Sequence, residues 1–382
     1  AEAITAAKRL QFKPAHKDGR PISSKTTVIF HFAPHLHEEE GGFSIVVEAN
    51  SVHDTKLQAT EVLSESELER TLSLDLSKTI SSVSGIHFSS GSSDNSKPII
   101  RGQTERRLLI LQDGIRHASQ KWGVDHAPEV DPFSAGEIEV IKGASGVRYG
   151  ADAIGGVLLL KPPKIGEVEG VHGKVLSAFS FNGQKGYGAG RIDWTKESRA
   201  LRIEGNLSSS ADLHTPEYLL GNTASQVWNI GSTIQQRFGE HQIRLNIRQY
   251  HNQAGVFYGI QNSSMEGFQA GIEQAQPAQA DSWTSDREID KPYQEVDHLL
   301  ASLHWTFPSF DWFDTEFIYA FQHNHRQEFE QAREAVTEAQ YDFILRTHSL
   351  DLHFNQMHLM IGIAEWENKF GVSGHFQENI YQ

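Results

Sequence analysis

Residues 98–161 read PIIRGQTERRLLILQDGIRHASQKWGVDHAPEVDPFSAGEIEVIKGASGVRYGADAIGGVLLLK, and the interpretation of the whole chain depends on them. Within this stretch, Asp113-Gly114 supplies a turn between two apolar runs, which predicts a β-hairpin over RRLLILQDGIR. Residues 136–143 alternate as a strand, and a glycine-punctuated loop or short helix over 143–156 precedes the apolar strand VLLLKP. These signals predict a compact mixed domain. Neither of the glycine-rich phosphate-binding signatures is present.

The composition of the 382 residues excludes several classes of protein. There is no cysteine, so disulfides, thiol catalysis and cysteine-ligated metals are ruled out. The formal net charge of −15 argues against non-specific nucleic-acid binding, which needs a basic surface. No run approaches the roughly 18 apolar residues of a membrane helix, whereas alternating strands of a membrane β-barrel hide their apolar half from such a count. We find no Ser/His/Asp order, no HExxH and no paired helical carboxylates, so we expect no enzyme.

Residues 35–53 are predicted to be a linker that carries one short strand. The segment HLHEEEGG combines charges with paired glycines. Its histidines His35 and His37, with His31 nearby, could ligate a metal, but solvated linker histidines are the more common case. The β-prone strand that follows has no partner of its own, so it invites pairing by edge addition from another protein. The strand consists of Phe43, Ser44, Ile45, Val46, Val47, Glu48 and Ala49.

Residues 54–86 have a helical pattern. Ser64 and Glu67 fit a capping box at the start of a helix. Leucine and isoleucine recur every four residues, which places them on one face of a helix. These residues are Leu68, Leu72, Leu76 and Ile80. A domain with helices and strands is therefore predicted to begin here and to continue into the stretch quoted above.

Four ordered motifs resemble the plug domain of TonB-dependent outer-membrane receptors: the helical segment, IIRG, LILQDGIR and IEVIKGASGVRYGADAIGGV. Two positions depart from that pattern. Ala144 stands where the family usually has proline, and Leu158-Leu159 stand where "IN" usually follows GGV, but neither change removes a charge or a turn glycine. The resemblance implies a plug domain over residues 54–165 and a TonB box at residues 43–49, which a partner protein would grip and pull.

The ends of the chain give two further expectations. Residues 1–34 contain AAKRLQFKPAHKDGRPISSKTTVIFHF, which resembles the end of the carboxy-terminal domain of TonB energy-transducer proteins. The alternative is a small β-rich accessory domain. The chain begins without Met and stops soon after an apparent strand, so we expect it to be a fragment of a longer protein.

If a plug is present, residues 166–382 should form strands of a barrel, and these should alternate with period two. Residues 199–208 pass this test because Leu201, Ile203 and Leu207 alternate with polar residues, and residues 242–248, 299–307 and 313–322 show the same period. The predicted fold class is an α+β plug domain inside a transmembrane antiparallel β-barrel, incomplete in this chain. About nine or ten strands are expected after residue 170, whereas a plugged transporter barrel has about 22. A complete ten-stranded barrel is the alternative, but its lumen would be too narrow for the plug.

The connections between these strands also alternate. Short turns are predicted near Glu197-Ser198, Gly239-Glu240 and Ser309-Phe310. Long polar links are predicted over residues 211–226, 252–296 and 326–340, and this asymmetry is typical of outer-membrane barrels. Four tryptophans near strand ends could form interfacial girdles, with simple packing as the alternative for any one of them. They are Trp194, Trp228, Trp305 and Trp312.

The link between plug strands at residues 117–136 is the predicted ligand site. It combines an aromatic ring, an imidazole and carboxylates, which suit a small polar ligand or a metal. The predicted substrate-binding residues are Gln120, Lys121, Trp122, Asp125, His126 and Glu129. The predicted metal ligands are Asp125, His126, His323 and His325. The alternatives are a loop stabilised by Asp125 turn bonds and Pro128, and solvated histidines at a barrel rim.

The pattern QKWGxDHAPExDPF resembles a receptor subgroup that includes zinc- and iron-type importers, and HTPEYLLGNT and FQHNHRQEFE look like that subgroup's barrel segments. The resemblance implies energy-coupled uptake of a scarce solute, a metal or metal chelate of the iron-siderophore, zinc, haem or cobalamin class. The implied location is the outer membrane of a Gram-negative bacterium, with the N-terminal segment in the periplasm.

The implied partners are the TonB-ExbB-ExbD complex, outer-membrane lipid and a small-molecule or metal substrate. The negative charge argues against nucleic acid as a partner, and no cofactor is required apart from a transported metal ion or metal chelate as ligand. Two alternative functions remain at this stage. One is a TonB-linked signalling receptor in which residues 1–42 contact a partner. The other is an adhesin or structural barrel with a vestigial plug.

Overall fold

The computed structural model describes residues 15–17, 20–22, 59–120, 126–143, 146, 149–257, 269, 271, 273–274, 276–277, 279–310, 313–330, 337–356, 359–361, 364–366 and 369–381. The predicted TonB box at residues 43–49 lies outside these residues, as does most of the segment that resembles a TonB domain. Both therefore stay predictions.

The chain divides into two compact units, Ala1–Leu57 and Gln58–Gln382. In the first unit, strands β1 (Ala15–Lys17) and β2 (Arg20–Ile22) pair antiparallel, with Lys17 opposite Arg20. Every other described helix and strand belongs to the second unit.

A five-stranded sheet forms the framework of the plug domain. Its strands lie in the order β3-β8-β9-β6-β7, and all neighbours are antiparallel except β6 and β9. The bounds are β3 Ala59–Ser64, β6 Leu108–Gln112, β7 Ile115–Arg116, β8 Glu137–Lys142 and β9 Gly156–Lys161. A separate hairpin of β4 (Ile86–Ser92) and β5 (Asn95–Ile100) completes the strands of this domain.

The predicted hairpin over RRLLILQDGIR is confirmed as β6 and β7. Gln112 lies opposite Ile115, so Asp113 and Gly114 alone make the turn. Both have positive φ, 53° and 80°, which is the backbone of a type I′ turn and explains why Asp-Gly stands here. The predicted strand over GEIEVIKG is β8, and a short 3₁₀ helix, Ala151–Ala153, lies in the glycine-rich connection before β9.

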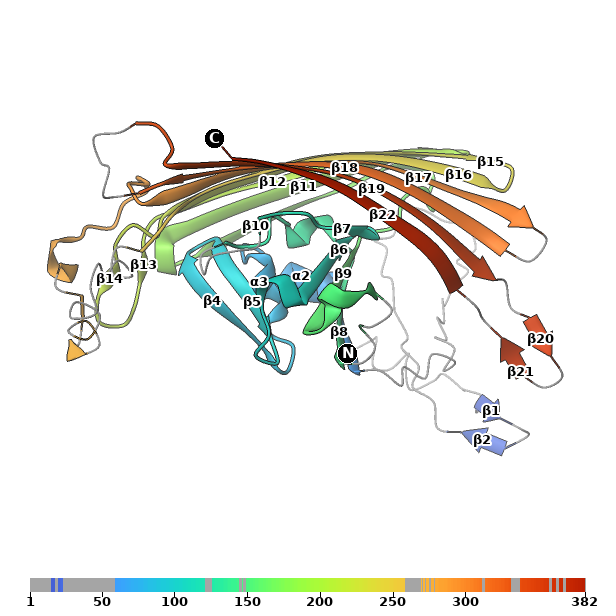
Figure 1. Ribbon diagram of the computed structural model, residues 1–382, viewed down its shortest axis with the longest axis horizontal. Coiled ribbons are helices and arrows are strands. Elements are labelled where there is room, and N and C mark those ends of the chain that lie inside the picture. Colours follow the sequence, from blue (N-terminus) through green and yellow to red (C-terminus); the bar gives the residue numbers. More distant parts are fainter. Residues whose placement is uncertain are drawn as a thin grey trace, which may run out of the picture. The chain divides into compact units, whose positions relative to one another are not determined.

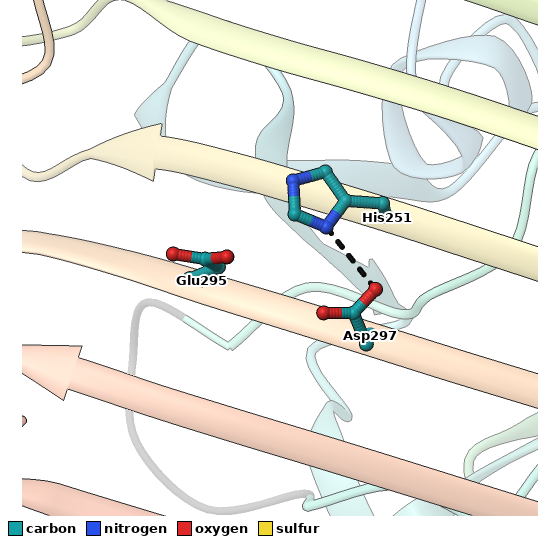
Figure 2. Close-up of side chains that lie close together, drawn as sticks. All are labelled: His251, Glu295 and Asp297. Atoms are coloured by element: carbon teal, nitrogen blue, oxygen red, sulfur yellow. Dashed lines mark hydrogen bonds and ion pairs between the residues drawn. The ribbon is translucent and has the colours of Figure 1, made fainter.

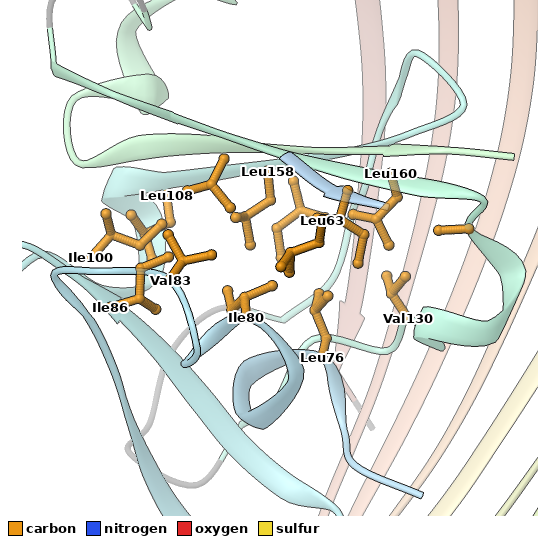
Figure 3. Packing of buried hydrophobic residues seen from close by; sticks show 14 of the residues in the cluster. Leu63, Leu76, Ile80, Val83, Ile86, Ile100, Leu108, Val130, Leu158 and Leu160 are labelled. Atoms are coloured by element: carbon orange, nitrogen blue, oxygen red, sulfur yellow. The ribbon is translucent and has the colours of Figure 1, made fainter. Parts of the chain in front are cut away.

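The plug core lies between this sheet and two short helices, α2 (Glu65–Arg70) and α3 (Leu76–Ile80). Figure 3 shows Leu76 and Ile80 directed towards Leu63, Leu158 and Leu160 of the sheet. On the other face of the sheet, a second cluster contains Leu109, Ile141, Ala153 and Val157. Because β9 is covered on both faces, it reads as a continuous apolar run instead of an alternating one. Each fully buried aliphatic side chain contributes roughly 1.5–3 kcal/mol.

The helical segment differs from the prediction in one respect. The capping box is confirmed, since the backbone N–H of Ser64 donates to Glu67 Oε2 at 2.8 Å. However, the four-residue spacing predicted one continuous face, whereas the chain leaves the helix after Arg70 and Ser73 takes a φ of 75°. Asp75 then caps α3 by accepting from the N–H of Lys78 at 3.0 Å. Leu72 lies between the two helices and is only half-buried.

None of the described helices is long and apolar enough to cross a membrane.

A nine-stranded antiparallel sheet, here called the wall, follows the plug; nine or ten strands were expected. Its order in the described part of the chain is β10-β11-β12-β15-β16-β17-β18-β19-β22, and in Figure 1 it curves over one side of the plug. The bounds are β10 Gly170–Ser180, β11 Lys185–Lys196, β12 Arg199–Ser210, β15 Ser225–Phe238, β16 His241–Gly255, β17 Tyr293–Phe310, β18 Phe313–Phe329, β19 Tyr341–Gln356 and β22 Lys369–Tyr381. Two small hairpins lie in its connections, β13 Leu213–His214 with β14 Leu219–Leu220, and β20 Leu359–Ile361 with β21 Ala364–Trp366.

The burial of the wall strands is inverted relative to a soluble sheet. Along β12, Arg202 and Glu204 are almost fully buried, whereas Ile203 and Leu207 are 53% and 66% exposed. The polar residues face the plug and the apolar residues face away from it. This arrangement is the one that a lipid-facing barrel wall requires, and it confirms the predicted period-two strands. We call the two sides of the wall its inner face and its outward face.

The two ends of the wall differ in their connections. Short turns join β11 to β12 and β15 to β16 at residues 197–198 and 239–240, as predicted. The third turn was predicted near Ser309-Phe310. Strand β17 passes through an irregularity there and ends at Phe310, and its antiparallel neighbour β18 begins at Phe313. We call this end the turn end. We call the opposite end of the wall the loop end. Three long links leave from it, over residues 211–224, 256–292 and 330–340. The 357–368 connection at the turn end is also long.

Aromatic rings gather at both ends of the outward face. At the turn end, the rings of Trp305 and Phe307 lie 4.4 Å apart. At the loop end, Trp228 stacks on His251 at 5.4 Å. Trp194, near the turn end, is 39% exposed, and the predicted Trp312 lies outside the described residues.

Gly155 offers a test of the plug packing. A Cβ at this position would lie 2.9 Å from the carbonyl oxygen of Arg107 and 2.8 Å from Leu108 Cδ2. We expect Gly155→Ala to destabilise the plug by about 1–3 kcal/mol through overpacking. Gly188→Ala, where a Cβ meets nothing within 4 Å, is the matched control. Hydrogen exchange of the β6 and β9 amides measures the effect, and equal exchange in both variants would contradict the packing described.

Candidate functional site

The candidate site is the plug segment at residues 117–136, which connects β7 to β8. Lys121, Trp122 and Asp125 lie outside the described residues, so their predicted role stays a prediction. The described part of the segment is mostly buried and lies against the inner face of the wall. It shows where three of the six predicted substrate-binding residues are held.

Glu129 is the centre of the best-connected part of this segment. Its Oε2 lies 2.9 Å from His117 Nε2, and its Oε1 accepts a hydrogen bond from Arg326 Nη2 of β18 at 2.6 Å. Arg326 also donates to Gln294 Oε1 of β17 at 2.7 Å. The Glu129 and Arg326 side chains are each less than 4% exposed, so a buried ion pair joins the plug to the wall.

The protonation of Glu129 follows from these contacts. Burial by itself raises the pKa of a carboxyl, because it disfavours the charged form. The hydrogen bond with His117 and the positive charge of Arg326 outweigh that effect and hold the pKa of Glu129 well below its usual range. Glu129 is therefore an anion in the folded protein.

Gln120 and His126 also bind to the wall. Gln120 Nε2 donates to Asn379 Oδ1 of β22 at 3.0 Å, and His126 Nε2 lies 2.8 Å from Glu328 Oε1 of β18. Both residues are about 5% exposed. Imidazole and carboxylate are the metal-ligand types that the sequence predicted here, although the carboxylate beside His126 comes from the wall.

Asp131 forms a further contact between plug and wall. Its Oδ1 accepts from the N–H of Phe133 at 2.9 Å, and its Oδ2 accepts from Asn229 Nδ2 of β15 at 2.6 Å. Burial, with the nearby charge of Glu204, raises the pKa of the Asp131 carboxyl to about 6. Asp131 thus differs from Glu129, because no arginine or lysine is bonded to it in the described part of the chain.

A small cavity of about 40 Å³ lies beside the segment. Its lining includes His117, Gln120 and His126 together with Lys97 and Glu105 of the plug. A cavity of this size has room for a few water molecules or a single ion. The cavity thus brings together three of the polar side chains of the candidate segment.

The four predicted metal ligands are not gathered into one site. Arg326 and Glu328 of β18 contact the plug and so lie on the inner face of the wall. His323 and His325 alternate with them along the strand and lie on the outward face. His325 Nε2 lies 2.8 Å from Asp342 Oδ1 of β19. His126 is therefore separated by the wall from His323 and His325.

Several residues of the candidate site were missed by the sequence analysis. They are His117, Gln294, Arg326, Glu328 and Asn379. The period-two pattern held a usable signal for two of them, since Arg326 and Glu328 occupy the alternate positions of FQHNHRQEFE that must face inwards if the apolar positions face outwards.

The comparisons with known proteins agree with this fold. Residues 53–157 match the family described as TonB-dependent Receptor Plug Domain. The vitamin B12 transporter BtuB of Vibrio vulnificus (strain YJ016) is 31% identical over 133 residues, 33% of this chain and 22% of that protein. The ferric aerobactin receptor of Klebsiella pneumoniae is 31% identical over 132 residues, 33% of this chain and 18% of that protein. The chain thus matches about a fifth of the length of these relatives.

Solved structures cover more of the chain at lower identity. The FrpB iron transporter from Neisseria meningitidis (F3-3 variant) has a TM-score of 0.65 at 16% identity and covers 85% of this chain and 49% of that one. A mutant of the ferric enterobactin receptor PfeA from Pseudomonas aeruginosa has a TM-score of 0.64 at 16% identity, with 86% of this chain and 50% of that one covered. The chain spans about half the length of these structures, and the resemblance to TonB-dependent receptors is confirmed.

The Glu129–Arg326 pair offers a test of how the plug is held. We expect Glu129→Gln or Arg326→Met alone to cost about 3–5 kcal/mol, because each leaves a buried charge without its partner. The double variant should recover most of this loss, since it removes both charges. Hydrogen exchange of the amides of residues 126–134 measures the cost. Single-variant losses that simply add in the double variant would contradict a direct coupling between the two side chains.

Proposed function

We propose that this chain, which has the plug domain of the TonB-dependent receptors and part of the barrel wall beside it, acts in energy-coupled uptake of a metal ion or metal chelate. Receptors of this family are outer-membrane proteins of Gram-negative bacteria. A transport role needs a barrier, a polar route past that barrier and a means of moving the barrier.

The polarity of the wall is the observation that carries the proposal. The outward face is apolar at positions such as Ile203 and Leu207, which suits contact with outer-membrane lipid. The inner face is polar, and the plug is attached to it by ion pairs and hydrogen bonds. A solute that moves along this interface meets polar groups, provided that the plug can part from the wall.

The chemistry of the cargo is proposed from the relatives and from the candidate segment. The names of the relatives refer to vitamin B12, ferric aerobactin and iron, and each of these solutes contains a metal. In this chain, His126 and Glu328 supply an imidazole and a carboxylate at 2.8 Å, and Asp125 precedes His126 in the sequence. We infer that these three residues bind the metal of the cargo, with Gln120, Lys121, Trp122 and Glu129 around it.

The energy source is proposed to be the TonB-ExbB-ExbD complex. The β-prone segment at residues 43–49 precedes the plug in the sequence, so a partner could add a strand to it and transmit a pull. This mechanism places the N-terminal segment in the periplasm. The pull would act on a plug that is attached to the wall by polar contacts, which water can replace when they separate.

Uptake of labelled zinc, a ferric siderophore and cobalamin by cells that produce the protein tests this function. We expect one of the three to accumulate in energised cells. Replacing both Ile45 and Val47 by proline should abolish accumulation but not binding at the cell surface, because proline cannot donate to an added strand. Ser44→Ala, which keeps every backbone N–H, is the control.

The same assay separates the role of the cargo site from that of the TonB box. His126→Ala should lower surface binding as well as accumulation, whereas His87→Ala, at an exposed position of β4, should change neither. Accumulation of none of the three solutes would contradict the proposal. Unchanged uptake by the proline variant would favour a barrel with a vestigial plug.

A further inference from the structure

Three potential metal ligands meet on the outward face of the wall, away from the plug. His251 of β16 and Glu295 and Asp297 of β17 each offer a ligand atom, and these atoms lie within 4.8 Å of one another. Figure 2 shows the three side chains on adjacent strands, with His251 Nδ1 hydrogen-bonded to Asp297 Oδ1 at 3.2 Å. No other group of three such ligands occurs among the described residues.

The register of the two strands brings these residues together. His251 is the direct cross-strand partner of Asp297, and Glu295 lies two residues before Asp297. Residues two apart on a strand point to the same side, and directly opposed Cβ atoms are about 4.5–5.5 Å apart. The three ligands therefore stand on a rigid part of the sheet instead of on a loop. Such a placement holds a metal site with little rearrangement.

Neighbouring side chains orient two of the ligands. The indole ring of Trp228 on β15 stacks on the His251 ring at 5.4 Å and an interplanar angle of 17°. Gln249 Nε2 donates to Asp297 Oδ1 at 3.2 Å. Outer contacts of this kind fix the orientation of metal ligands and strengthen binding.

The charge of the cluster favours a cation. Within the described part of the chain, neither Glu295 nor Asp297 forms a salt bridge with lysine or arginine, and the ionic partner of Asp297 is His251. Two carboxylates close together repel each other unless a positive charge lies between them. A divalent ion would supply that charge.

The position of the cluster separates it from the proposed cargo route. Along the outward face of β16, exposed Leu245 and Ile247 give way to Gln249 and His251 towards the loop end. The cluster therefore lies just beyond the apolar band, at the point where the long 256–292 link leaves the wall. The plug and His126 are on the other side of the sheet, so an ion bound here is not on a path through the interior.

We propose that His251, Glu295 and Asp297 form a second metal site, which binds a divalent transition-metal ion of the zinc class on the outward face of the wall. One imidazole nitrogen and two carboxylate oxygens are a ligand set that Zn²⁺ accepts at about 2.0–2.2 Å, with the fourth position open to water or another oxygen. The bound ion links β16 to β17 at their loop end. The ion takes the place of the proton that His251 Nδ1 and Asp297 Oδ1 share in their hydrogen bond, because a metal ligand must be deprotonated.

Zinc titration of the purified protein in detergent tests this site. The His126→Ala background removes the imidazole of the proposed cargo site, so the test does not depend on the proposed function. The carboxamide variants below then show whether the remaining binding belongs to the cluster on the wall. In this background we expect Zn²⁺ to bind in competition with a chelator. Asp297→Asn and Glu295→Gln keep side-chain size and should each weaken binding more than about tenfold, because even outer-shell losses cost about 10–100-fold.

His348→Ala is the matched control. This histidine also lies on the outward face, where its Nδ1 is 2.8 Å from the hydroxyl of Tyr319, and it should not affect Zn²⁺ affinity. Far-UV circular dichroism shows that each variant has folded, and the absorption of bound Co²⁺ reports the same site independently. Absence of Zn²⁺ binding in the His126→Ala background, or unchanged affinity in both carboxamide variants, would overturn the proposal.

Discussion

The buried polar interface between the plug and the inner face of the wall is the constraint on which the rest of the structure depends. Glu129 with Arg326, and Asp94 with Lys185, are ion pairs whose side chains are almost fully buried. Each of these charges would cost several kcal/mol to bury alone, so the plug is positioned where these four charges meet in pairs. A buried apolar cluster also joins the two parts, with Ile115 of the plug packed against Leu300 and Ile318 of the wall. Water can replace the polar contacts of this interface if the plug and the wall separate.

The two-faced wall accounts for the low hydrophobic content of the chain. A wall with an apolar outward face and a polar inner face needs apolar residues at alternate positions only, so a hydrophobic content of 38% is compatible with such a wall. The plug then needs its own apolar core, which its helices and central strands supply on both faces of its sheet. The outward face changes from apolar to polar at the loop end, and the cluster of His251, Glu295 and Asp297 lies there.

Local signals in the sequence predicted the local structure. The pair Asp113-Gly114 predicted the turn of the β6–β7 hairpin, because few residue pairs tolerate positive φ at two successive positions. Ser64 and Glu67 predicted the capping box at the start of α2. The helix break at Ser73 was missed because a spacing of four residues fits one helix or two. Contacts across the fold were not predictable: Glu129 and Arg326 are 197 residues apart, and their meeting depends on how the wall curves around the plug. The cluster on β16 and β17 depends on a register that the 256–292 link does not reveal.

A disulfide between plug and wall tests most directly whether the proposed transport requires the plug to part from the wall. The chain contains no cysteine, and the N–H of Ser93 in the plug donates to the carbonyl oxygen of Thr223 beside β15 at 3.3 Å. Backbones this close are within reach of the Cα separation that a disulfide needs. With Ser93→Cys and Thr223→Cys combined, we expect oxidised cells to bind solute but not accumulate it, and a reductant to restore uptake. Uptake at the wild-type rate with the crosslink complete would show that transport proceeds without that separation.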